Sequence, residues 1–277
     1  MSFIQILSRP KNAFAIEAEN VENNNWKKAC TETGEEYFYN NAGESQWAYP
    51  TGNGKFIPSW DVNWDKQPVS KVGVVHQIVL IRHGQYADVS LNDLGREQAL
   101  ITANRLKILL QSRDIAPIKK YFYSTVPRAQ ETSDIILTQL SDQSLKPEPC
   151  TMLREGAVAR PDPPTNPKWQ PTDAKFEMDG ARVEAAFKTY FSRPPERAES
   201  SFTTVLVCHG NVIRYLVARA LQFPPETWTR LRVFNASITI LEIRHDGVVI
   251  LRALGDTGHF DGSMITDNHK IHKFIPK

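Results

Sequence analysis

The chain has 277 residues and a formal charge of +2 at pH 7, and 41% of its residues are apolar. This is ordinary globular composition, and a total charge near zero excludes a protein whose whole surface binds a polyanion such as nucleic acid. Its three cysteines lie far apart and form no CxxC pair, so we expect a reducing compartment, no disulfide framework, no metal and no cofactor. The longest apolar stretch, residues 72–81, is half of the roughly 20 residues that a membrane-spanning helix needs, so no membrane-spanning segment is expected.

The charge is unevenly distributed along the chain. Residues 1–65 hold 5 Lys and Arg against 9 Asp and Glu. Residues 66–277 hold the other 28 Lys and Arg and the other 22 Asp and Glu. We interpret residues 1–22 as a flexible tail. Its first half carries Arg9 and Lys11 and no acid, as in a weak mitochondrial presequence, but Pro10 interrupts the helix that such a signal needs. A targeting signal and a disordered tail therefore both remain open.

Residues 23–52 form the first segment with a distinct pattern. The aromatic block Tyr37-Phe38-Tyr39 lies between two turn signals, which predicts three short antiparallel strands. Because alternate side chains of a strand face opposite ways, Tyr37, Tyr39 and Trp47 are expected on one face. A sheet this small cannot bury both faces, so the aromatic face predicts a binding surface. The alternative is an aromatic loop that packs on the main domain.

This segment resembles a WW domain in its two tryptophans, its central aromatic triplet followed by Asn40, and its closing Pro50. The resemblance implies that Tyr37, Tyr39 and Trp47 form a groove for proline-rich peptides, which are pre-ordered and lose little entropy on docking. The turn between the second and third strands is about one residue shorter than usual, which leaves the class of peptide open.

Residues 53–73 are interpreted as a linker, with glycines and prolines on both sides of an unusual run. That run contains Trp60, Asp61, Asn63, Trp64 and Asp65. Two tryptophans are costly to leave in water, so we expect them to dock on the same chain or on a neighbouring one.

From residue 74 to residue 258 the pattern alternates between strands and helices. Strands are predicted at 76–82, 119–123, 150–156, 203–209, 236–243 and 248–254, and helices at 92–111, 127–140, 179–191 and 211–221. This alternation predicts a three-layer α/β/α domain with a mainly parallel sheet, followed by a tail at 259–277. Ligands of such sheets bind beyond the carboxyl ends of the strands.

Chemically active side chains follow four of these predicted strands. His83 and His209 each come after an apolar strand and before a glycine, and Arg82, Arg128 and Glu155 lie at strand ends or in the turns that follow. Phosphoryl transfer needs cations around the phosphoryl oxygens and a nucleophile in line with the leaving group. A neutral imidazole can supply the nucleophile, arginines hold phosphate, and a carboxylic acid can protonate the leaving oxygen. This set predicts an enzyme that acts on phosphoesters.

These segments are similar to the histidine phosphatase superfamily, whose signature is the Arg-His-Gly at 82–84. Residues 91–99 and 124–132 match the two motifs that follow it. The resemblance implies that His83 is the nucleophile and that Glu155 is the proton donor. It also implies that phosphate is bound by Arg82, Gly84, Arg128 and His209, and that His209 belongs to the catalytic set as well.

The resemblance is closest to the mitochondrial serine/threonine protein phosphatases of the phosphoglycerate-mutase-like branch. It rests on RHGQY, LREGAVARPDPP, DGARVEAAF, HGNVIRY and LGDTG. It implies phosphoprotein substrates, a mitochondrial location (with the cytoplasm as the alternative) and a homo-oligomer assembled through Trp60–Asp65. Val62 stands where that assembly motif usually has a proline. The alternative functions are a small-molecule phosphatase or mutase and, in another class, a WW-mediated scaffold.

Overall fold

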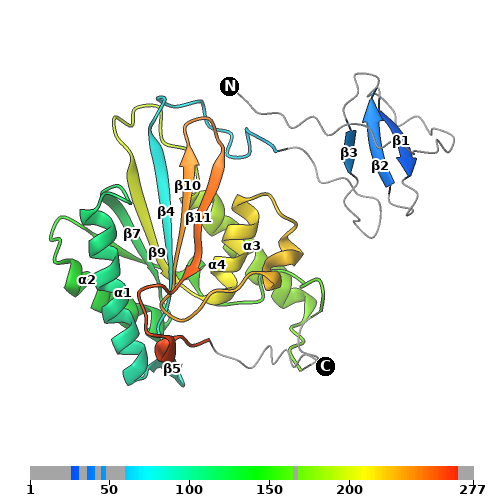
Figure 1. The fold of residues 1–277 in the computed structure, drawn as a ribbon. Coiled ribbons are helices and arrows are strands. Elements are labelled where there is room, and N and C mark those ends of the chain that lie inside the picture. The colour runs from blue at the N-terminus through cyan, green and yellow to red at the C-terminus, as the bar shows by residue number, and fades with distance from the viewer. Residues whose placement is uncertain (1–25, 31–35, 41–44, 48–59, 165–167, 268–277) are drawn as a thin grey trace. The chain divides into compact units, whose positions relative to one another are not determined.

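The computed structural model describes the chain except residues 1–25, 31–35, 41–44, 48–59, 165–167 and 268–277 (Figure 1). For the three strands before residue 60 it describes the backbone alone. The chain divides into two compact units, Met1–Asp61 and Val62–Lys277, and each is described by itself.

The N-terminal unit contains a small antiparallel sheet. Its strands are β1 (Trp26–Cys30), β2 (Glu36–Asn40) and β3 (Ser45–Trp47), in the order β1-β2-β3. Tyr37 is the register partner of Trp47 across the β2–β3 pair. The predicted three-stranded antiparallel arrangement is therefore present. The aromatic side chains lie outside the described part, so the peptide groove stays a prediction.

The C-terminal unit is built on a six-stranded sheet in the order β11-β10-β4-β9-β7-β8. The central strands β4 (Val75–Arg82) and β9 (Phe202–Cys208) are parallel to each other and to β7 (Ile118–Ser124) and β8 (Pro147–Cys150). The strands β10 (Ile238–Arg244) and β11 (Val249–Asp256) run antiparallel, as their tight connection requires. A separate short pair, β5 (Tyr86–Ala87) and β6 (Ser90–Leu91), follows β4.

Helices cover both faces of this sheet. On one side lie α1 (Asp93–Gln111) and α2 (Pro127–Leu140), and on the other lie α3 (Asp173–Tyr190) and α4 (Gly210–Ala220) (Figure 1). Three 3-10 turns complete the described elements: η1 (Thr151–Leu153), η2 (Pro225–Arg230) and η3 (Gly262–Met264). The predicted three-layer α/β/α architecture is confirmed.

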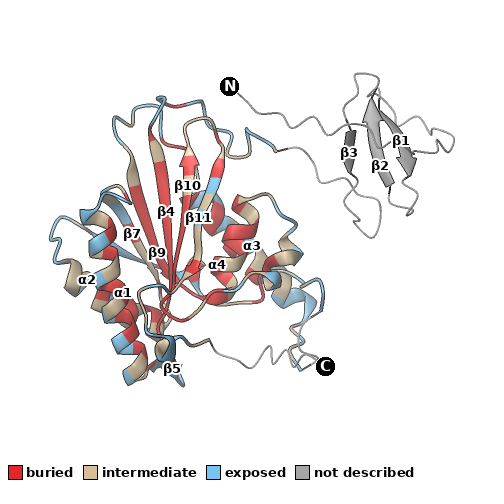
Figure 2. Ribbon diagram, in the orientation of Figure 1, coloured by how far each residue is buried: buried red, intermediate tan, exposed pale blue. Residues whose placement is uncertain are grey.

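The core lies between the sheet and the two helical layers, where Figure 2 shows the strands and the facing sides of the helices buried. On the α1–α2 side, Ala103, Leu106 and Ile136 pack against alternate residues of the four central strands. Burial of both sheet faces explains why β4 and β9 are continuous apolar runs.

Two predicted elements differ from the structure. The segment 150–156 is not a strand, because β8 ends at Cys150 and η1 follows it. The carbonyl groups of Met152 and Arg154 accept hydrogen bonds from the Arg182 side chain. The helix predicted to begin at 179 begins at Asp173, where the Thr172 side chain caps it by accepting from the Lys175 N–H. Within the described residues, no helix is long and apolar enough to cross a bilayer.

Candidate active site

The carboxyl ends of three neighbouring parallel strands, β4, β9 and β7, lie side by side, and this end of the sheet is called its carboxyl edge. β9 lies between β4 and β7, and Arg82 at the end of β4 is the register partner of Cys208 at the end of β9. The next residues, His83 and His209, have ring centroids 5.1 Å apart. Arg128, in the first turn of α2 after β7, contacts both rings. The structure thus brings together the two histidines that the sequence places 126 positions apart (209 − 83).

His83 is held in a single tautomer. Its Nδ1 lies 2.7 Å from the carbonyl oxygen of Gly84, which can only accept, so Nδ1 carries the proton. Its Nε2 accepts from Nε of Arg128 at 3.1 Å, which leaves the Nε2 lone pair directed into the cluster of cations. Burial lowers the pKa of His83 well below its usual range, and His209, Arg82 and Arg128 lower it further. The ring is therefore neutral and poised as a nucleophile at neutral pH.

His209 is neutral for the same reasons and has the opposite tautomer. Its Nδ1 accepts from Arg128 at 3.3 Å, so its Nε2 donates to the Ser124 hydroxyl at 2.8 Å. Burial lowers its pKa well below the usual range, and Arg128 and Arg82 add to the effect. Ser124 is the last residue of β7, so one strand end orients the histidine of the next.

Arg82 is a buried cation with an unused donor. It is 7% exposed, its NH1 donates to the carbonyl of Val233 at 2.9 Å, and its Nε has no hydrogen-bond partner. Burial lowers its pKa to about 10, so the guanidinium stays charged at neutral pH. A buried charged donor without an acceptor is costly, and a phosphoryl oxygen is the type of acceptor that would satisfy it.

Glu155 is the carboxyl group of the site. It is partly exposed, and its Oε1 accepts from the N–H of Gly156 at 3.1 Å. Burial raises its pKa, against the opposing effect of that N–H and of Arg82, Arg128 and Arg214. A raised pKa keeps a carboxyl protonated closer to neutral pH, as a proton donor requires.

Several residues that hold His83 and Gly84 in place have no signal in the sequence as members of the site. The carbonyl of His83 accepts from the Ala236 N–H and the Asn235 side chain, and the Gly84 N–H donates to Thr132. The ring of Tyr86 lies edge-on to His83 with centroids 5.1 Å apart, and the Arg128 guanidinium lies 4.4 Å from the Tyr86 centroid. Only Thr132 could have been inferred, because it lies one helical turn after Arg128.

Two helices begin at this edge. The residues that precede them, Val126 for α2 and His209 for α4, make no capping hydrogen bond with their side chains. At α4 the first N–H groups and the positive end of the helix dipole remain available to an anion. At α2 only the dipole does, because Pro127 has no N–H and the Arg128 and Ala129 N–H groups donate to the carbonyls of Val89 and Val126. With Arg82 and Arg128 they make this edge a phosphate-binding environment.

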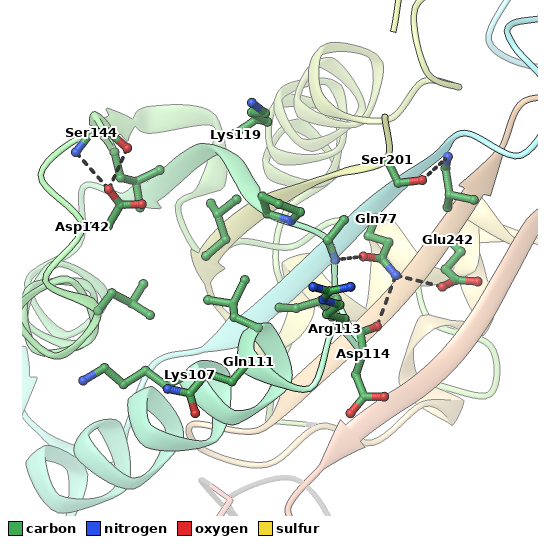
Figure 3. Close-up of a pocket in the computed structure, with 18 of the residues that line it drawn as sticks. Gln77, Lys107, Gln111, Arg113, Asp114, Lys119, Asp142, Ser144, Ser201 and Glu242 are labelled. Carbon is green, nitrogen blue, oxygen red and sulfur yellow. Dashed lines mark hydrogen bonds between the residues drawn. The ribbon is translucent and has the colours of Figure 1, made fainter. Parts of the chain in front are cut away.

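The described residues also contain a cavity of about 1170 Å³ that is remote from this chemistry. It is lined from the beginnings of β4 and β7 and the ends of α1 and α2, at the opposite edge of the sheet. The Gln77 side chain within it is hydrogen-bonded to Ala116, Asp114 and Glu242 (Figure 3). None of the predicted site residues lines this cavity. No group of three or more His, Cys, Asp or Glu in the described ranges could hold a metal ion.

The second half of the tryptophan-aspartate segment packs on its own catalytic unit. The indole N–H of Trp64 donates to the carbonyl of Gly247 at 2.8 Å, and its ring lies 5.5 Å from Phe187. The Asp65 carboxylate pairs with Arg193 at 2.6 Å, and the two side chains are 2% and 3% exposed. Asp61 and Asn63 are exposed, and Trp60 is partly buried with no hydrogen bond from its indole N–H.

Comparison with known proteins assigns the class. Residues 78–255 match the model of the histidine phosphatase superfamily, branch 1. The chain belongs to this family and is a phosphatase, a hydrolase.

Curated relatives narrow the assignment. The chain is 42% identical over 240 residues to the protein named serine/threonine-protein phosphatase Pgam5, mitochondrial, of Drosophila persimilis, an alignment that covers 75% of this chain and 81% of that one. Its identity to the mouse protein of the same name is 41%, over 75% of this chain and 80% of that one. Among solved structures, a phosphoglycerate mutase from Plasmodium falciparum matches at 29% identity with a TM-score of 0.48, over 66% of this chain and 92% of that one.

Proposed function

We propose that this chain is a mitochondrial serine/threonine protein phosphatase that works through a phosphohistidine on His83. The observation that carries the proposal is the neutral His83 ring, whose Nε2 faces Arg128 with His209 and Arg82 around it. The names of the Pgam5 relatives support a protein substrate and a mitochondrial location.

The reaction has two steps. In the first, the Nε2 lone pair of His83 attacks phosphorus, the P–O bond to the serine or threonine breaks, and the proton of Glu155 goes to the leaving oxygen. The guanidinium groups of Arg82 and Arg128 stabilise the charge on the phosphoryl oxygens. The Gly84 N–H and the His209 Nε2–H, which the family resemblance also assigns to phosphate, instead donate to Thr132 and Ser124 and help to fix the site. In the second, a water molecule attacks phosphorus, gives its proton to the Glu155 carboxylate, and the P–N bond breaks to return the electron pair to Nε2.

Trapping the intermediate tests the mechanism. The wild-type protein quenched in denaturant should carry an acid-labile, alkali-stable phosphoryl group, and His83→Ala should carry none. The variant should retain less than roughly 1% of kcat on phosphopeptides, because loss of a nucleophile typically costs several powers of ten. Retention of more than a few per cent would mean that His83 is not the nucleophile. Identifying the phosphoproteins that stay bound to His83→Ala would name the substrates.

A substrate panel tests the class of substrate. Phosphoserine and phosphothreonine peptides should be turned over with higher kcat/KM than 3-phosphoglycerate. The reverse order, or transfer of the phosphoryl group to a second site on phosphoglycerate, would instead assign a small-molecule phosphatase or mutase. An absence of turnover on every phosphoester would favour a scaffold.

The N-terminal unit is proposed as a WW-like module, residues 23–52, that recruits proline-rich partners through Tyr37, Tyr39 and Trp47. The antiparallel order β1-β2-β3 supports this proposal. In the full chain, a proline-rich peptide should bind the wild type and lose affinity at least about tenfold in Tyr39→Ala, since an aromatic anchor of an interface commonly contributes about 2 kcal/mol. Equal affinity of both proteins would reject the groove.

Residues 60–65 are proposed as the segment through which copies of the chain assemble. Because Trp64 and Asp65 also bind their own catalytic unit, Trp60→Ala is the cleaner test. We expect a smaller assembly by light scattering and a lower kcat, because a buried aromatic anchor contributes roughly 2 kcal/mol to a contact. Unchanged size together with unchanged turnover would reject this role.

A further inference from the structure

The backbone around Glu155 is held by a network that the reaction as described does not use. It comes from one helix, α3, where Asp179 and Arg182 face residues 152–157. Within the described residues, neither side chain forms a hydrogen bond or ion pair with His83 or Arg128.

Arg182 binds three carbonyl groups of this segment. Its NH1 donates to the carbonyl of Met152 at 2.8 Å and to that of Arg154 at 2.6 Å, and its NH2 lies 3.4 Å from the carbonyl of Glu155. The guanidinium therefore supplies the donors that a neighbouring strand would otherwise provide. This explains why a segment that reads as a strand is fixed without belonging to the sheet.

Asp179 closes the network from the other side. Its Oδ2 accepts from the N–H of Ala157 at 2.8 Å, and its Oδ1 pairs with Arg182 at 2.9 Å. The side chain is 5% exposed. Burial acts to raise the pKa of Asp179, but hydrogen bonds from Lys175, Ala157 and Arg182 outweigh it, so the pKa is lowered and the carboxylate stays charged.

The fit between the helix and the segment is close. A Cβ built on Gly156 would lie 2.5 Å from the Asp179 carboxyl carbon and 2.6 Å from NH2 of Arg182. On its other side, the carbonyl of Gly156 accepts from the Asn211 side chain at 3.1 Å, two residues after His209. The peptide that follows Glu155 is thus held between α3 and the beginning of α4.

We propose that Asp179 and Arg182 are positioning residues that hold the Glu155 carboxyl against the phosphoryl site and thereby set its efficiency as a proton donor. The inference rests on the proposed function, because it acts through Glu155. A catalytic group displaced by about 1 Å can lose two orders of magnitude in rate, so a fixed backbone matters for this step.

Leaving-group dependence separates positioning from general structural damage. The phenol released from p-nitrophenyl phosphate is acidic and leaves without a proton, whereas the serine oxygen of a phosphopeptide needs one. The comparison is made in kcat/KM, which reports formation of the phosphoenzyme and not the later hydrolysis step, in which Glu155 acts on both substrates alike. Glu155→Gln should therefore lower kcat/KM on the phosphoserine peptide by roughly 10²- to 10⁴-fold and affect that of p-nitrophenyl phosphate far less. Arg182→Met should show a smaller loss with the same selectivity: kcat/KM should fall about 10- to 100-fold on the peptide and by under about threefold on p-nitrophenyl phosphate.

Two further variants keep the test decisive. Lys188→Met, an exposed residue of the same helix, should behave as wild type on both substrates. Arg182→Lys keeps a charge beside Asp179 but cannot bridge the three carbonyl groups, so it should show the selective loss even if Arg182→Met fails to fold. In the double variant Glu155→Gln with Arg182→Met, the second change should cost nothing more, because its effect passes through Glu155.

The outcomes distinguish the positioning role of Asp179 and Arg182 from the role of Glu155 as proton donor. If Glu155→Gln is selective but both Arg182 variants lose the two substrates equally, or lose neither, the positioning role is wrong and the proton donor stands. If Glu155→Gln itself shows no selectivity, Glu155 is not the donor and both ideas fail. Additive losses in the double variant would also overturn the positioning role.

Discussion

At the scale of single residues, the site is defined by two imidazoles that remain neutral beside two arginines. Burial and the nearby guanidinium groups disfavour a second proton on either ring, so both pKa values are lowered. The carboxyl of Glu155 responds to the same burial in the opposite sense and keeps its proton to higher pH. One environment therefore favours both an unprotonated His83 Nε2 and a protonated Glu155 carboxyl.

Gly84, the residue after His83, is a second feature at this scale. A Cβ on Gly84 would overlap the backbone carbonyl of Gly95, at the beginning of α1. We expect Gly84→Ala to cost at least about 2 kcal/mol of unfolding free energy and most of the activity, because two backbones must separate. Urea unfolding and kcat are the measurements. Gly262→Ala, where a Cβ meets nothing within 4 Å, is the matched control and should stay within about 0.5 kcal/mol; equal effects at the two glycines would contradict this account.

At the scale of elements, the strand ends and their histidines could be predicted because buried parallel strands read as apolar runs. Patterns in the sequence placed β4, β9, α1 and α2 within one or two residues. The strand predicted at 150–156 is absent for a physical reason, since a segment at the side of the sheet can take its hydrogen bonds from a side chain such as Arg182. Such tertiary contacts, like those of Asn235 with His83, leave no periodic signal in the sequence.

The buried ion pair between Asp65 and Arg193, which holds residues 62–65 on the catalytic unit, gives a prediction at this scale. Asp65→Ala leaves Arg193 buried without its carboxylate, so we expect a loss of about 3 kcal/mol in unfolding free energy by urea titration. Lys188→Met removes an exposed ion pair and should change the free energy by less than about 1 kcal/mol. Adding Arg193→Met to Asp65→Ala should recover part of the loss; a double variant as unstable as the sum of the two single ones would show that the pair does not act as a unit.

At the scale of the whole molecule, buried neutral histidines lie at both ends of the central strand. His76, at the beginning of β4, donates from Nδ1 to the carbonyl of Ser192 and accepts from the Thr204 hydroxyl, each at 2.8 Å. Burial lowers its pKa to about 4. His83 and His209 at the other edge shift in the same direction.

These shifts make the fold sensitive to acid. Below about pH 6.5 the unfolded chain binds protons that the folded chain excludes, so stability falls as pH falls from about 6.5 towards 4. His76 alone should contribute up to about 1.4 kcal/mol per pH unit in that window. Urea unfolding at pH 7.5, 6 and 5 measures the slope, and His76→Gln should flatten it. A slope unchanged by this variant would exclude His76 as a source.

The position of β9 also determines when the enzyme can first work. β4 and β7 are made early in synthesis, yet they are not neighbours until β9, which comes more than seventy residues after β7, inserts between them. A growing chain that ends before residue 209 therefore lacks the strand that lies between those of His83 and Arg128 in the sheet. We therefore expect a chain truncated before residue 209 to have no phosphatase activity, because its site would lack both β9 and His209.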